Sequence, residues 1–223
     1  MAKLEEKGIL GIKGIIFDLY NTLIDIDTDE QSINTYEAVS KWLIYQGVKI
    51  PAEDLKKKYR QMAKEGIEAK WEKHPEIRVD EIFASICKSH ALWDIDEVRL
   101  GVETARAFRA GSLRRLQLFP QTLHILAELK SYPKVIVSNG QKSFSEPEMR
   151  YFGLYEQFTH VIFSSDFGHK KPDPRIFLEA ARLMSIEPEE IMCIGDSFEN
   201  DIAASSRLGM RAMHIEEVWK LLG

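Results

Sequence analysis

The chain has 223 residues, of which 44% are hydrophobic and 29% charged, which fits one large domain or a domain with an insertion and argues against disorder. The net charge of −5 argues against a nucleic-acid partner bound by phosphate neutralisation, and the two distant cysteines, Cys87 and Cys193, match neither a zinc pattern nor a disulfide framework. No apolar run reaches the roughly 18 residues of a membrane span, and acidic residues interrupt the N-terminal segment, so we expect a cytoplasmic protein without membrane or nucleic-acid partners.

The first predicted element is a buried strand over residues 14–17, which ends at Asp18. From about residue 30 to residue 110, hydrophobic residues then recur at helical spacing in four successive segments, with no convincing strand between them. Asp94 or Asp96 can cap the last of these helices. Four helical segments in a row predict a separate helical bundle.

From about residue 118, short apolar strands alternate with helices. The strands are expected at 134–137, 161–164, 191–194 and 211–215, and the helices at 120–130, 140–153, 173–184 and 200–209. This alternation predicts a Rossmann-like α/β fold, a doubly wound parallel sheet with helices on both faces. We assign residues 1–24 and 115–223 to this core and residues 25–114 to an inserted α-helical domain.

Polar residues follow four of the predicted strands. Ligands of open parallel sheets bind at the carboxyl ends of the strands, so these side chains are expected to share one crevice. Each residue taken alone has an ordinary explanation as a turn former or helix cap. Together the acids, a hydroxyl, backbone amides and one lysine make a site for a phosphate neutralised by a metal: Asp18, Ser138, Asn139, Lys171, Asp196 and Asp201.

The sequence resembles the haloacid dehalogenase superfamily, because four segments look like its four motifs in the correct order. They are residues 18–23 (DLYNTL), 137–140 (VSNG), 171–174 (KPDP) and 195–201 (GDSFEND). The resemblance covers residues 12–24 and 115–217, and the helical insertion sits where that superfamily carries its helical cap.

This resemblance implies a hydrolase in which Asp18 is the nucleophile and forms an aspartyl-phosphate that water hydrolyses. It implies Mg²⁺ bound by the Asp18 carboxylate, the main-chain carbonyl of Tyr20 and Asp196, and a small-molecule phosphate substrate. The other implied roles are charge neutralisation by Lys171, orientation of that lysine or of a metal-bound water by Asp201, a fixed loop at Thr22, and phosphate binding by Ser138, Asn139 and Gly140.

The first motif departs from the phosphatases of the superfamily, most of which have aspartate where this chain has Tyr20. In those enzymes the aspartate is the general acid and base. Tyrosine at this place is typical of the 2-haloacid dehalogenases, whose nucleophile attacks carbon and whose halide leaves without a proton. The phenol of Tyr20 is therefore a candidate catalytic group, and the alternative is that it only packs under the helical insertion. Arg60 could be the cap arginine that those dehalogenases use for halide and carboxylate, although a solvated helix face also explains it.

The last motif favours a phosphatase. The dehalogenases need no metal and have serine at the place of Asp196, asparagine at that of Phe198 and tyrosine at that of Phe177. Three converging carboxylates without a cation would repel one another, and Mg²⁺ removes this conflict. The sequence therefore favours Mg²⁺-dependent hydrolysis of small phosphate esters or anhydrides.

Two alternatives stay open: a metal-independent 2-haloacid dehalogenase, and a weakly active phosphate-binding module in which Tyr20 marks lost catalysis. A response-regulator receiver is disfavoured, because receivers carry the phosphorylated aspartate at the third strand. The sequence indicates neither the individual substrate nor the oligomeric state.

Overall fold

The computed structural model describes residues 10–222; the acidic residues of the N-terminal segment, on which the expected location rests in part, lie outside this range. Its centre is a five-stranded sheet in which all neighbouring strands are parallel. The strand order is β5 (His160–Phe163), β4 (Lys134–Ser138), β1 (Gly14–Phe17), β6 (Ile191–Gly195) and β7 (Arg211–His214). The predicted parallel α/β fold is confirmed, and its central strand, β1, leads directly into Asp18.

The sheet is buried on both faces. Ile15 and Phe17 of β1 belong to one hydrophobic cluster, and Ile16 between them belongs to the other, as alternating side chains of a strand require. Helices α6 (Thr122–Glu128), α7 (Lys142–Tyr151) and α11 (Ile215–Leu222) contribute to the first cluster, and α9 (Pro174–Met184) and α10 (Ala204–Ser206) to the second. This two-sided burial explains the continuous apolar runs of the strands.

The segment after β6 differs from the expected helix over 200–209. It begins as a π-helical turn over Phe198–Ala203, which Ser197 caps by accepting a hydrogen bond from the amide of Asn200 at 3.2 Å. The short helix α10 follows and ends before Gly209, whose φ is +83°. Short connections complete the core: α8 (Ser164–Phe167) and 3₁₀ turns at Tyr155–Gln157 and Pro188–Glu190.

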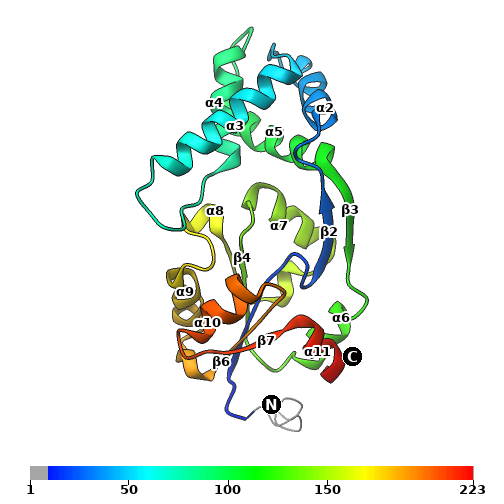
Figure 1. Ribbon diagram of the computed structural model, residues 1–223. Coiled ribbons are helices and arrows are strands. Elements are labelled where there is room, and N and C mark those ends of the chain that lie inside the picture. Colours follow the sequence, from blue (N-terminus) through cyan, green and yellow to red (C-terminus); the bar gives the residue numbers. More distant parts are fainter. Residues whose placement is uncertain (1–9, 223) are drawn as a thin grey trace.

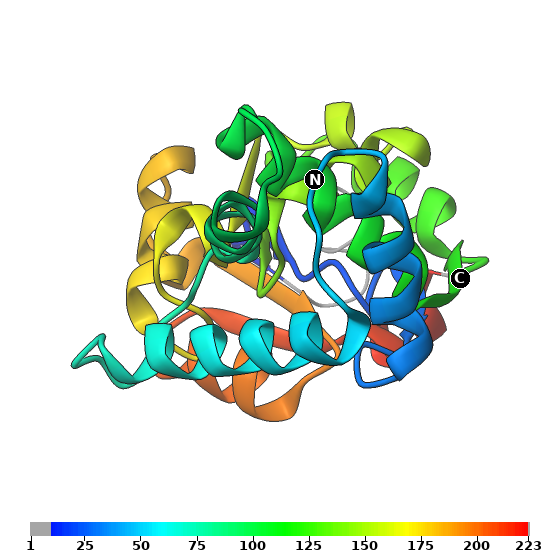
Figure 2. The ribbon, with the colours of Figure 1, turned by 90° about the horizontal axis from the view of Figure 1, so that it is seen from above.

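Four helices lie over the carboxyl ends of the strands (Figure 1; Figure 2 shows them from above). They are α2 (Ile33–Ile44), α3 (Ala52–Glu68), α4 (Val79–His90) and α5 (Glu97–Ser112), and they match the four predicted helical segments. Asp96 caps α5 by accepting a hydrogen bond from the amide of Arg99. Within residues 10–222 no helix, including the 17-residue α3, is long and apolar enough to cross a membrane.

These four helices have a hydrophobic core of their own. Tyr36, Phe83 and Phe108 are buried in it, and the ring of Tyr59 stacks on that of Phe83 with centroids 5.0 Å apart. A separate core is what an inserted domain requires, although the boundary we place at residues 25–114 stays a prediction.

An antiparallel pair of strands links the helical layer to the core, and the sequence did not indicate it. The strands are β2 (Ile24–Thr28) and β3 (Leu113–Leu118). Asp25 forms an ion pair with Arg115 at 2.8 Å and accepts a hydrogen bond from Gln117 at 2.9 Å. The polar residues of these short strands resemble those of a loop in the sequence. Their partners lie on the opposite strand and are known only once the strands are paired.

Candidate active site

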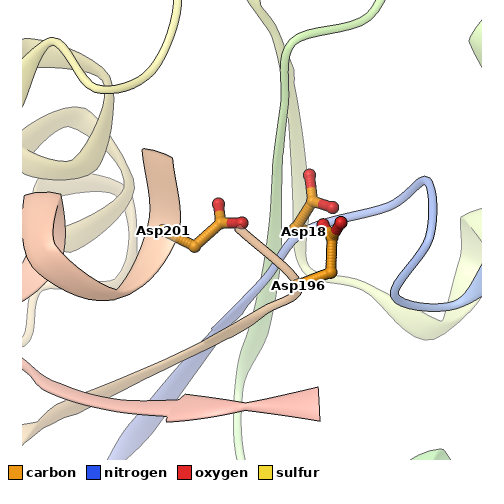
Figure 3. A group of neighbouring side chains, drawn as sticks. All are labelled: Asp18, Asp196 and Asp201. Atoms are coloured by element: carbon orange, nitrogen blue, oxygen red, sulfur yellow. The ribbon is translucent and has the colours of Figure 1, made fainter. Parts of the chain in front are cut away.

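Three carboxylates meet at the carboxyl ends of β1 and β6. Asp18 follows β1, Asp196 follows β6, and Asp201 lies on the π-helical turn after β6 (Figure 3). One oxygen from each carboxylate can be chosen such that all three lie within 4.8 Å of one another. The fold therefore brings together the three acids that the sequence placed at one crevice.

Lys171 lies between two of these carboxylates. Its Nζ atom is 2.6 Å from an oxygen of Asp18 and 2.6 Å from an oxygen of Asp201, and its side chain is only 3% exposed. Burial on its own lowers the pKa of Lys171, but the carboxylates of Asp18 and Asp201 outweigh it and raise that pKa. The lysine is therefore a fixed positive charge at neutral pH.

The remaining carboxylate oxygens of Asp18 and Asp201 also accept hydrogen bonds. Thr22 Oγ1 donates to Asp18 Oδ2 at 3.1 Å, and the amide of Ser197 donates to Asp201 Oδ2 at 3.1 Å. The turn between Asp18 and Thr22 passes through Asn21, whose φ of +61° lies in the left-handed region that asparagine tolerates. Both carboxylates are thus oriented by groups of the protein itself.

The site has an excess of negative charge, since three carboxylates face the single ammonium of Lys171. Burial, followed by the charge of Asp18, raises the pKa of both Asp196 and Asp201. The main-chain carbonyl of Asp196 is fixed by the ring of His214, whose Nε2 lies 2.9 Å away. An oxygen-only donor set with unbalanced negative charge fits a hard divalent cation such as Mg²⁺, held by carboxylates of this cluster.

A cavity of about 310 Å³ opens beside the carboxylates, and Ser138 and Asn139 line it. The side chain of Asn139 hydrogen-bonds the backbone of Lys171 in both directions, because Nδ2 donates to the carbonyl at 3.0 Å and Oδ1 accepts from the amide at 2.7 Å. Asn139 therefore also fixes the loop that carries the lysine. Gly140 lines a neighbouring cavity instead of this one.

The side chain of Tyr20 is engaged by residues that the sequence analysis did not identify. Its hydroxyl donates to Glu148 at 2.5 Å and lies 2.8 Å from the hydroxyl of Ser145. Arg109 of α5 pairs with Glu148 at 2.7 Å and lies over the Tyr20 ring. Burial, then the charge of Glu148, raises the pKa of Tyr20 above its usual range. No sequence spacing links these residues, because the turn after β1, α5 and α7 meet only in the folded chain.

Arg60 is exposed on α3 and is absent from the described linings of both the 310 Å³ cavity and its neighbour. A larger groove of about 670 Å³ lies elsewhere, between the helical layer and α7. Three ion pairs balance most of its charged side chains: Arg78–Asp80, Lys142–Asp166 and Arg150–Glu146. The remaining charged residue of its lining, Arg106, donates to the carbonyl of Ser143. The excess of negative charge is therefore at the strand ends and not in this groove.

Gly195 allows Asp201 to approach the end of β6. A Cβ atom at this position would lie 2.4 Å from both Cγ and Oδ2 of Asp201. We expect Gly195→Ala to displace Asp201 from Lys171 and to lower turnover by about 10²-fold, the effect of a misplacement of about 1 Å. The measurement is kcat beside the melting temperature, with Gly111→Ala on α5 as a control that meets only ordinary contacts. Unchanged kcat in Gly195→Ala would contradict this role.

A parallel α/β sheet whose central strand ends at a lysine-paired aspartate in an acidic crevice has the arrangement that a hydrolase with a carboxylate nucleophile requires. The haloacid dehalogenase-like hydrolase family model matches residues 12–209, and the chain belongs to this family.

Relatives with different activities resemble this chain over most of its length. A glyceraldehyde 3-phosphate phosphatase from Methanothermobacter thermautotrophicus is 28% identical over 204 residues, which are 91% of this chain and 84% of that protein. A 2-haloacid dehalogenase structure from Pseudomonas syringae matches with a TM-score of 0.64 and 27% identity, over 90% of this chain and 85% of the other. A HAD phosphatase structure from Thermococcus onnurineus matches with a TM-score of 0.60 and 21% identity, over 95% and 98% of the two chains, which supports the fold.

Proposed function

We propose that this hydrolase is a Mg²⁺-dependent phosphatase that cleaves small phosphate esters or anhydrides through an aspartyl-phosphate on Asp18. The observation that carries the proposal is the presence of Asp196 beside Asp18 and Asp201, because this third carboxylate leaves the site short of positive charge. A cation that balances the acids also reduces their repulsion of a phosphate dianion. The similarity to the Methanothermobacter thermautotrophicus protein, which is named as a phosphatase, extends over 84% of that protein and supports the same conclusion.

The residues of the chain account for two displacement steps. An oxygen of Asp18 attacks phosphorus, and the bond between phosphorus and the leaving oxygen breaks, so that oxygen departs with the bonding electrons. Water then attacks phosphorus, the bond to Asp18 breaks, and inorganic phosphate leaves with the aspartate restored. Lys171 offsets negative charge throughout, and Asp201 keeps it in place. Mg²⁺, bound by Asp18, Asp196 and the carbonyl of Tyr20, would supply electrostatic stabilisation of the transferring group.

A 2-haloacid dehalogenase is the second candidate, and Tyr20 together with the Pseudomonas syringae structure favours it. Asp18 would then attack carbon and displace a halide ion, which leaves without a proton. In this reaction the negative charge of Asp196 has no evident use. For this reason we place the dehalogenase second.

One experiment separates the two candidates. Phosphate release from p-nitrophenyl phosphate and chloride release from 2-chloropropionate are measured with Mg²⁺ and again with EDTA. We expect phosphate release that EDTA abolishes and no chloride release, because the unbalanced carboxylates need a cation. Chloride release that persists in EDTA, without phosphatase activity, would establish the dehalogenase instead.

The phenol of Tyr20 is not expected to act as the general acid, because it donates to Glu148 and its pKa is raised. Tyr20→Phe should therefore change kcat by less than about threefold, whereas loss of a general acid typically costs about 10²–10⁴-fold. For the same reason, p-nitrophenyl phosphate, whose leaving group needs no proton, should be cleaved faster than a sugar phosphate.

The control for this variant is Tyr36→Phe, which removes another buried phenol within the helical layer. Paired kinetics on p-nitrophenyl phosphate and a sugar phosphate decide the matter. A loss in Tyr20→Phe that is large and confined to the sugar phosphate would show that the phenol does supply the proton.

A further inference from the structure

A second cavity, of about 330 Å³, adjoins the cavity beside the carboxylates. Tyr20 and Asn139 line both cavities, so the two meet at these residues. If a phosphate group occupies the first cavity, the group that it esterifies extends into the second. The chemistry of the second cavity therefore selects the leaving group.

The walls of this second cavity are largely apolar and aromatic. Rings and branched side chains from both layers line it: Tyr59, Phe108, Phe144, Ile26, Ile77 and Val79. Tyr59 is held by stacking on Phe83, and its ring centroid is 5.1 Å from that of Phe108. Such walls favour a flat apolar group and cannot solvate a buried anion.

Two carboxylates belong to the same wall, Glu30 and Glu76. Glu76 is fixed, because Ser164 Oγ donates to one of its oxygens at 2.7 Å and the amide of Ile77 donates to the other at 2.9 Å. The segment around it is tied to α7 by Gln141, whose Nε2 donates to the carbonyl of Ile77 at 2.9 Å. The position of this negative charge is therefore built into the contact between the helical layer and the core.

The cavity offers little positive charge in return. Arg109 is the only basic residue among its described lining residues, and it is 8% exposed. Its guanidinium is already paired with Glu148 at 2.7 Å and lies 3.6 Å from Glu30. A carboxylate or second phosphate on the leaving group would thus meet acids without a free cation.

We propose that the leaving group is an aromatic alcohol that carries no negative charge, and that a positively charged substituent is preferred. Aromatic faces and carboxylates together attract a cation, whereas they exclude an anion by like-charge repulsion and by poor solvation. This inference rests on the proposed function, because it concerns the alcohol that the same phosphatase site would release.

Three aryl phosphates with the same ring test the inference: 4-ethylphenyl phosphate, O-phosphotyramine and 4-(phosphonooxy)phenylacetate. Their side chains are neutral, cationic and anionic, and their phenols have closely similar acidity, so leaving-group chemistry is matched. We expect kcat/KM in the presence of Mg²⁺ to be highest for the cation and lower for the anion by about tenfold or more. A neutral compound that is cleaved no better than the anion would overturn the inference.

Variants of the two cavity acids test whether they cause the preference for a cationic leaving group. Glu30→Gln and Glu76→Gln should each lower the ratio of kcat/KM for the cationic over the anionic substrate, by about threefold or more. The control, Glu53→Gln in the first turn of α3, removes an exposed charge of the same layer outside the cavity and should keep the ratio. A ratio unchanged in both cavity variants would overturn the assignment to these acids. Hydrolysis of all three substrates without an anion penalty overturns the inference and leaves the phosphatase intact, whereas no hydrolysis of any of them overturns both.

Discussion

Replacing Asp18 with asparagine is expected to lower phosphate release by about 10⁴-fold or more, since the amide cannot form the aspartyl-phosphate. The variant should still fold. Asparagine has nearly the same shape, and Lys171 keeps its ion pair with Asp201 at 2.6 Å. The measurement is kcat on p-nitrophenyl phosphate with Mg²⁺, together with the melting temperature.

Asp27→Asn on β2 is the matched control, because it removes an exposed aspartate of the linking strands and should keep full activity. Beryllofluoride, which mimics a phosphoryl group on a carboxylate, gives a second readout. It should protect the wild type from thermal unfolding and have no effect on Asp18→Asn. Turnover within about a hundredfold of the wild type would contradict covalent catalysis by Asp18.

The sequence predicted the parts of the site that depend only on strand order. Asp18 and Lys171 are 153 positions apart, yet each follows a predicted strand, and parallel strands place their carboxyl ends at one edge. The buried strands themselves were predictable because two-sided burial leaves continuous apolar runs. These features are local in sequence, and the parallel topology then brings the residues at the strand ends together.

Side-chain contacts between elements that are distant in sequence were not predictable. The hydroxyl of Tyr20 reaches Glu148, 128 positions away, and no periodicity marks either residue as the partner of the other. Likewise, Glu76 of the helical layer accepts a hydrogen bond from Ser164 of the core. The sequence does not reveal which residues of the helical layer face the core in this way. Arg60 was predicted because an arginine in that region fits the dehalogenases. It lies exposed on α3, and the sequence did not reveal that it faces away from the core.

Lys171→Met is expected to destabilise the protein by about 3–5 kcal/mol at neutral pH in EDTA, because it leaves buried carboxylates without their cation. Methionine nearly matches lysine in length, so packing changes little. The same variant should lose about 10²-fold or more in kcat with Mg²⁺, since a fixed positive charge no longer stabilises the transferring phosphoryl group. Urea unfolding measures the first effect and steady-state kinetics the second.

The destabilisation in Lys171→Met should depend on pH in a defined direction. Burial and the charge of Asp18 already raise the pKa of Asp201, while the Lys171 ammonium lowers it, so that pKa rises further when the ammonium is removed. A carboxyl group whose pKa is higher in the folded state binds its proton more tightly there, so its contribution to stability is present below the unfolded pKa of about 3.9 and is lost as pH rises through the folded value. The difference in unfolding free energy between wild type and Lys171→Met should therefore be largest near neutral pH and decrease as pH falls toward about 4. The double variant Lys171→Met/Asp201→Asn should recover part of the stability at neutral pH, because it removes one of the two acids that pair with Lys171 in the wild type. A gap of equal size at both pH values, with no recovery in the double variant, would mean that methionine fails by packing and that the ion pairs of Lys171 with Asp18 and Asp201 contribute little.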